Sequence, residues 1–184
     1  MKLKNKLSAA ALLVLSAVGT ASAGGLINNV PQYYQEHSNW CWSAAATMVL
    51  NYHGRAVAQC TFVNASFNIN YACGNGEFYW NSPANQGNYN WNVDDAMNYF
   101  WGNQSFYQLN GYLSMGSVQW YVQRSKPLVM SWQWSGGGGH DVVLNGYHDD
   151  LVHINDPWNG SYWRTYASTV SASDRYWYDS VLTK

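Results

Sequence analysis

The sequence has little charge and no excess of basic residues. Nine Lys and Arg stand against ten Asp and Glu among 184 residues, and three of the lysines lie within the first six positions. Without those three, six basic residues face ten acidic ones, a formal charge of −4. A chain with this balance offers no basic surface to nucleic acid or to anionic lipid. We therefore exclude nucleic-acid binding as its function.

Long apolar runs are absent except near the N-terminus. The run at 7–18 has about a dozen residues, fewer than the roughly 20 that a transmembrane helix needs. Three lysines precede it and the triplet ASA at 21–23 follows it, which is the pattern of a cleaved bacterial signal peptide. We predict that residues 1–23 are removed during export. Residues 24–184 would then form a single secreted or periplasmic domain without a membrane anchor.

Cysteine is also scarce, and its count is odd. The chain has Cys41, Cys60 and Cys73, and an exported protein with three cysteines keeps one thiol over or forms an intermolecular bridge. Cys60 and Cys73 enclose only 12 residues, so we predict a disulfide that closes a loop between them. Cys41 would then be the free thiol, with either a structural or a nucleophilic role.

Glycine and proline divide the rest of the chain into helices and strands. The interval from Trp40 to His53 contains neither residue, which predicts a helix with Ser38 or Asn39 as its N-cap and Gly54 just beyond its end. Further helices are predicted at 93–101 and 114–124, a loop on the rim of a cleft at 74–90, and strands at 128–132, 141–147, 151–156 and 161–166. Helices followed by an antiparallel meander indicate an α+β fold, with an N-terminal helical part packed on a C-terminal β-sheet.

Cys41 lies at the start of the first predicted helix, between Trp40 and Trp42. Free N–H groups and the positive end of the helix dipole stabilise a thiolate there. We therefore predict that Cys41 is a nucleophile and that the two tryptophans line the cleft around it. Six residues earlier, Gln35 could place its side-chain amide beside the Cys41 N–H group as an oxyanion hole.

A thiol nucleophile needs a base, and His140 is the best placed of the five histidines. It follows four glycines and opens a predicted strand, so its ring can project from the edge of a sheet. Asp156 ends the next strand, and a hairpin that turns near His148 would bring residues 140 and 156 side by side. Asp156 could then orient the imidazole, whereas Asn155 points to the other face of the sheet.

Three segments resemble papain-like cysteine proteases, and most closely their bacterial secreted and effector branch. They are the stretch QEHSNWCW at 35–42, the strand GHDVVLNGY at 139–147 and the stretch INDPW at 154–158. The resemblance implies a papain-like, two-lobed fold with the active-site cleft between the helical part and the sheet. It also implies hydrolysis of peptide bonds in a protein or peptide substrate by a monomeric enzyme without metal or other cofactor.

Carried over position by position, the resemblance implies a role for each candidate residue. Cys41 would be the nucleophile that forms a thioester acyl-enzyme, His140 the base and then the acid, and Asp156 the group that orients the imidazole. Gln35 and the Cys41 N–H group would form the oxyanion hole. Trp158, two residues after Asp156, would line the cleft.

Three other interpretations remain open at this point. A peptidoglycan amidase or endopeptidase uses the same Cys and His chemistry in the same chain order. An inactive, aromatic-rich binding module could keep the fold without the activity. A metal site built on Cys41 and His140 is the weakest alternative, because the sequence has no CxxC or HxxxH pair to support it.

Overall fold

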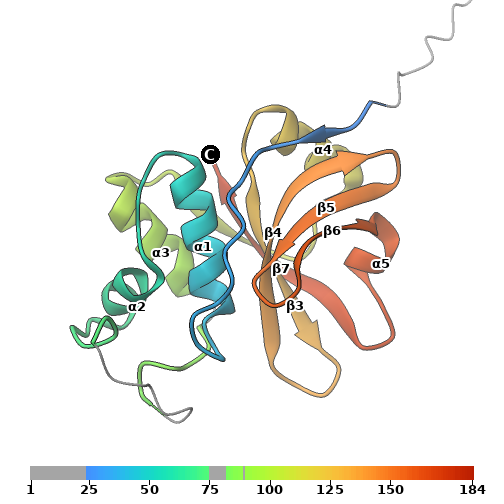
Figure 1. The fold of residues 1–184 in the computed structure, drawn as a ribbon. Coiled ribbons are helices and arrows are strands. Elements are labelled where there is room, and N and C mark those ends of the chain that lie inside the picture. The colour runs from blue at the N-terminus through green and yellow to red at the C-terminus, as the bar shows by residue number, and fades with distance from the viewer. Residues whose placement is uncertain (1–23, 75–81, 89) are drawn as a thin grey trace, which may run out of the picture.

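A helical part and a β-sheet pack side by side in the computed structural model, which describes residues 24–74, 82–88 and 90–184 (Figure 1). The predicted signal peptide at 1–23 lies outside the described residues, as does much of the loop predicted at 74–90. No helix within the described ranges combines the length and the apolar character that crossing a bilayer requires.

The helical part contains the three helices that precede the main strands. They are α1 (Cys41–Tyr52), α2 (Gln59–Phe67) and α3 (Asn90–Trp101). Helix α1 forms because an alanine-rich run has high helix propensity, and its small side chains let the helix approach the sheet closely. Ala44, Ala45 and Ala46 are fully buried, and α1 packs directly against strand β4 of the sheet.

The sheet is antiparallel and has the order β2-β7-β3-β4-β5-β6, with β1 paired to β4. Its strands are β1 (Leu26–Ile27), β2 (Phe106–Asn110), β3 (Leu128–Trp134), β4 (Gly139–His148), β5 (Leu151–Asp156), β6 (Gly160–Thr165) and β7 (Arg175–Thr183). Helices α4 (Met115–Gln123) and α5 (Tyr166–Val170) complete the described elements. The predicted α+β class is confirmed. The predicted order along the chain, a helical part followed by the main sheet, is confirmed as well.

One part of the α1 prediction is wrong. Neither Ser38 nor Asn39 caps the helix; Trp40 holds the N-cap position and makes no side-chain capping hydrogen bond. The reason is that both predicted caps bind a neighbouring segment instead. The Asn85 amide donates to the Ser38 hydroxyl at 2.9 Å, and the Asn39 amide donates to the Asn85 carbonyl at 2.9 Å.

The predicted disulfide between Cys60 and Cys73 is present, but the segment that it closes is not simply a loop. Cys60 lies in the first turn of α2, which occupies much of the enclosed sequence before the chain turns back. Phe62 and Val63 of this helix are fully buried in the core of the helical part. The disulfide therefore links Cys73, which follows the enclosed segment, to the first turn of α2.

Loss of this disulfide should lower stability without removing the site. A Cys60→Ser/Cys73→Ser variant should lose roughly 3 kcal/mol of unfolding free energy, because a cross-link over a loop of this length restricts the unfolded chain by about that amount. Urea unfolding of the two proteins measures the difference. A variant as stable as the wild type would show that α2 is held by its packing alone.

Candidate active site

Cys41 is the first residue of α1, and its sulfur lies close to backbone N–H donors. The N–H groups of Cys41 and Trp42 lie close enough to the sulfur to favour the thiolate, and the N-cap side chain makes no hydrogen bond that would compete for them. The N–H group of Asp141 on β4 makes a third such contact. The start of α1 and the start of β4 therefore meet at the thiol.

The pKa of the Cys41 thiol is raised, whereas its position at the helix start predicted a stabilised thiolate. Burial raises the pKa of Cys41 to about 12, the negative charge of Asp141 adds to this rise, and the three N–H groups only partly oppose it. The helix start favours the thiolate as predicted, but desolvation outweighs it. An isolated thiol in this position is protonated at neutral pH, so it needs a base to become a nucleophile.

His140 has one ring nitrogen bound and the other available. Its Nε2 lies 2.7 Å from the Asp156 carboxylate, and both residues are almost fully buried. Its Nδ1 is buried and has no hydrogen-bond partner among the described residues. The ring stacks on Trp158, with centroids 4.1 Å apart and planes 15° apart. The imidazole is thus held in one orientation with a single nitrogen left for chemistry.

Asp156 is surrounded by donors. One carboxylate oxygen binds His140 and the Trp158 N–H at 2.7 Å, and the other accepts from the Asn159 amide at 2.9 Å and the Tyr162 hydroxyl at 3.1 Å. Burial alone would raise the pKa of Asp156, but its hydrogen bond to His140, the charge of that ring and the other donors hold it well below the usual range. The group is therefore ionised at neutral pH.

The two residues meet through a strand register different from the predicted one. Near the turn Gly146 pairs with His153, but Leu144 pairs with Ile154, so a bulge at Asn145 adds one residue to β4. The turn lies at 149–150, further along the chain than predicted, so the ladder directs residue 156 toward residue 142 and not toward residue 140. The two side chains still share a face and meet diagonally, which the reach of an imidazole allows.

Asn155 lies away from the imidazole. Its amide donates to the Val30 carbonyl at 3.0 Å, and its oxygen accepts from the Ser161 hydroxyl at 2.9 Å. Alternation along β5 places it on the face opposite Asp156. Asp156, and not its neighbour, is therefore the residue that contacts His140.

Gln35 does not form the predicted oxyanion hole in this structure. Its amide nitrogen donates to the carbonyls of His37 and Ser38, both at 2.8 Å, because the loop before α1 folds back over it. Its Oε1 is buried without a partner among the described residues. The other predicted donor, the Cys41 N–H group, lies close to the Cys41 sulfur, and its role in an oxyanion hole stays a prediction.

The three tryptophans predicted to line the cleft occupy different positions. Trp42 lines a cavity beside Cys41, and its indole donates to the Gln86 carbonyl at 2.9 Å. Trp158 is half exposed over His140. Trp40, in contrast, is fully buried in the helical core and donates to the Ala84 carbonyl at 2.8 Å. It therefore packs beneath the start of α1 and does not line the cleft.

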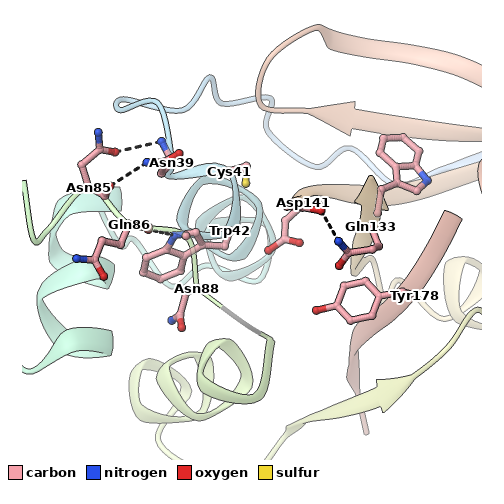
Figure 2. A pocket seen from close by; sticks show the side chains of 13 residues that line it. Asn39, Cys41, Trp42, Asn85, Gln86, Asn88, Gln133, Asp141 and Tyr178 are labelled. Carbon is pink, nitrogen blue, oxygen red and sulfur yellow. Dashed lines mark hydrogen bonds between the residues drawn. The ribbon is translucent and has the colours of Figure 1, made fainter. Parts of the chain in front are cut away.

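Sequence reasoning missed Asp141, which lines the same cavity (Figure 2). Its side chain is 6% exposed, and burial raises its pKa to about 6, although the Ser131 hydroxyl and the charge of His140 oppose the rise. The signal was present in the sequence, because an acid directly after His140 opens the otherwise apolar run VVL. Nothing in the sequence alone, however, directed that acid toward Cys41.

These groups together supply a nucleophile, a base and a group that orients the base. The thiol is the one free cysteine of the chain, since the other two form the disulfide. The imidazole keeps one nitrogen available, and the carboxylate fixes its other nitrogen. This arrangement suits acyl transfer.

Comparison with known proteins gives the same class. Residues 27–181 match the model of the peptidase C39-like family. No curated protein matches the chain significantly. A C39-like peptidase from Bacillus anthracis has a similar structure, with a TM-score of 0.63 and 21% identity over 88% of this chain and 98% of its own.

A second similar structure is that of a double-glycine-motif protease from an AMS/PCAT transporter, determined in complex with its leader peptide. It has a TM-score of 0.51 and 18% identity over 86% of this chain and 94% of its own. At these identities the two structures support the fold, and the family model supports the activity. The predicted resemblance to papain-like cysteine peptidases is confirmed in this form, and the chain belongs to the peptidase C39-like family of cysteine peptidases.

Proposed function

We propose that this chain is an exported bacterial peptidase that hydrolyses peptide bonds in other proteins through Cys41, His140 and Asp156. The observation that carries the proposal is the His140–Asp156 pair, buried at 2.7 Å with Nδ1 left unpartnered, on a strand whose next residue contacts the Cys41 sulfur. A buried pair with only a structural role would have no need of an adjacent free thiol.

In the first half of the reaction, His140 Nδ1 takes the thiol proton and the sulfur attacks the carbonyl carbon of the scissile bond. The N–H group of Cys41 stabilises the oxyanion that forms. Gln35 can assist only if its amide exchanges one of its two carbonyl partners for the oxyanion. His140 then gives its proton to the leaving amine, and a thioester remains on Cys41.

In the second half, water attacks the thioester carbonyl while His140 accepts a proton from it. The tetrahedral intermediate collapses, the C–S bond breaks, and the proton returns to the sulfur. Asp156 stays ionised throughout, holds the ring in one tautomer and stabilises the imidazolium. The stacked Trp158 limits the access of water to one face of the ring.

Three further observations support the exported peptidase. The basic and apolar segments before residue 24 have the pattern of a signal peptide. The structural neighbour bound to a leader peptide supports a peptide as the substrate class. The resemblance of residues 35–42 and 154–158 to the bacterial secreted branch supports the same assignment.

One experiment tests export and substrate together. Protein collected from the periplasm or medium should begin at Gly24, and it should release peptides from casein, whereas the Cys41→Ala protein should not. Purified peptidoglycan is digested in parallel. Release of cell-wall fragments without casein cleavage would assign the chain to the amidase class, and no reaction with either substrate would favour a binding module.

A further inference from the structure

A cavity of about 480 Å³ opens beside Cys41 (Figure 2). Trp42 and the segment 85–88 form one wall, and Gln133 of β3 and Tyr178 of β7 lie across from them. Because the nucleophile itself lines this space, the side chain of a residue next to the scissile bond would enter it. The lining should therefore determine which side chain the enzyme accepts.

The lining carries a single formal charge. Asp141 is the only Asp, Glu, Lys or Arg among the described residues that line the cavity, and the rest are mainly amides, glycines and aromatic rings. Figure 2 shows its carboxylate directed toward Trp42, on the cavity side of β4. No ion pair within the described ranges joins Asp141 to a Lys or Arg, and the nearby charge of His140 is paired with Asp156.

The surroundings of Asp141 increase the negative potential there. Asp179 of β7 is buried nearby, and its charge contributes to the raised pKa of Asp141. The Ser131 hydroxyl donates one hydrogen bond to the Asp141 carboxylate. A buried carboxylate without a counter-ion is unfavourable, and a cation that enters the cavity offsets this cost.

The other walls also suit a cation. The half-buried ring of Tyr178 attracts an ammonium or guanidinium group, and the side-chain oxygens of Asn88 and Gln86 can accept its hydrogen bonds. Among the described residues of the lining, none has a basic side chain that would repel such a group. Charge, an aromatic ring and acceptors therefore favour the same ligand.

We propose that this cavity binds a lysine or arginine side chain flanking the scissile bond of the substrate, with Asp141 as its counter-ion. This proposal rests on the proposed peptidase function and adds the substrate class. Asp141 acts here as a specificity-determining residue, because it contacts the substrate side chain and not the reacting atoms.

Cation binding would also affect the nucleophile. The charge of Asp141 is one of the two causes that raise the pKa of the Cys41 thiol. A substrate cation paired with Asp141 cancels that contribution and makes transfer of the thiol proton to His140 easier. A basic side chain should therefore increase kcat as well as decrease KM.

The turnover test uses peptides that differ only in lysine or norleucine at each of the two positions flanking the cleaved bond. In the wild type, kcat/KM should favour lysine by about tenfold or more at one of them. Asp141→Asn keeps the shape of the side chain and should reduce the ratio to within about threefold. Asp150→Asn, which removes a charge from an exposed turn, should keep the wild-type ratio.

The same ratio should depend on pH. Since the pKa of Asp141 is about 6, the preference for lysine in kcat/KM should fall toward one as the pH is lowered from 8 to 5. His140, Cys41, Asp179 and Tyr178 are the other titratable groups around it. Ionisation of His140 and Cys41 affects the chemical step for both peptides of a pair and largely cancels in the ratio. The charge of Asp179 favours lysine as that of Asp141 does, so its protonation lowers the ratio in the same direction.

A binding test separates this proposal from the catalytic one. With Cys41→Ala protein, calorimetry should show tighter binding of the lysine peptide than of the norleucine peptide, and Cys41→Ala/Asp141→Asn should bind both alike. Selective binding without turnover by the wild type would overturn only the catalytic proposal. Equal affinities, including no measurable binding of either peptide, or a lysine preference that survives Asp141→Asn, would overturn the assignment of the cavity.

Discussion

Replacing Cys41 with alanine should lower peptide hydrolysis by at least about 10⁴-fold and leave the fold intact. Removal of a nucleophile that acts together with its base costs an enzyme nearly the whole of its chemical catalysis. Alanine fits the start of α1, because it favours helix and fills less space than the thiol. Turnover of a fluorogenic peptide measures the loss, and thermal unfolding checks the fold.

Chemical labelling tests the state of the same thiol. Iodoacetamide should modify one residue per wild-type molecule, Cys41, and none in Cys41→Ala, because Cys60 and Cys73 are joined in a disulfide. The wild type should react faster than N-acetylcysteine at pH 7, since an imidazole takes the thiol proton. Mass spectrometry gives the site and the rate.

His140→Ala should make the thiol slower than N-acetylcysteine. Without the base, the raised pKa of about 12 leaves only about one thiol in 10⁵ ionised at pH 7. His148→Ala is the matched control, because it removes an exposed histidine from the other end of the same strand. Wild-type labelling no faster than that of the model thiol, together with an absence of proteolysis, would contradict the catalytic assignment.

Local sequence signals predicted the parts of the fold that depend on neighbouring residues. The interval from Trp40 to His53 predicted α1 because helix propensity and the lack of breakers act within a few turns. The hairpin of β4 and β5 was predicted because a polar turn separates two apolar runs. Helix α2 was missed, because its asparagine, threonine and aromatic residues have only modest helix propensity.

Features that depend on distant residues were predicted less well. Strands β2 and β7 were missed; they pair with each other from opposite ends of the second half of the chain. The N-caps proposed for α1 were wrong because Asn85, far along the sequence, binds both of them. The orientation of the Gln35 amide likewise follows from how its loop folds, which the spacing to Cys41 does not specify.

For the site residues, too, the sequence predicted which residues take part, but not the surroundings that determine their protonation. Order and context along the chain brought out Cys41, His140 and Asp156 as candidates. The pKa of the thiol depends on burial and on Asp141, and the charge of Asp141 depends in turn on Asp179 of another strand. A sequence names such groups but does not give the desolvation that determines their protonation.

Replacing Asp156 with alanine should produce the second large effect. It leaves five described donors without their acceptor, including the His140 ring and the Tyr162 hydroxyl. Loss of one partner from a buried charged network costs on the order of 3–5 kcal/mol, and loss of the orienting group lowers turnover by about 10³- to 10⁴-fold. Urea unfolding and kcat measurements on the same preparation give both numbers.

Asp156→Asn should be milder, with turnover reduced by about 10- to 100-fold. The amide oxygen can still accept from His140 and from the Trp158 N–H group, so the ring stays oriented. The new NH₂ group faces the Asn159 amide, which must turn to offer its oxygen, and the Tyr162 hydroxyl must turn likewise. The negative charge that stabilises the imidazolium is lost in either case.

Asn155→Ala is the matched control for these variants, because it removes a neighbouring buried amide from the other face of β5. It should cost about 1–2 kcal/mol of stability through its bonds to Val30 and Ser161 and leave kcat within a few-fold of the wild type. If Asn155→Ala lowered turnover more than Asp156→Asn, the assignment of Asp156 as the orienting residue would be wrong.

The pH dependence of stability distinguishes the charge of Asp156 from its shape. The pKa of Asp156 is lower in the folded state than in the unfolded chain, so its ionised form stabilises the fold above about pH 4. That contribution is lost as the pH falls through the folded-state value. Asn at this position does not titrate, so the difference in unfolding free energy between wild type and Asp156→Asn should be greatest at neutral pH and narrow below about pH 4. A gap that stayed constant down to pH 2 would mean that Asp156 stabilises the site by shape and hydrogen bonding alone, without its charge.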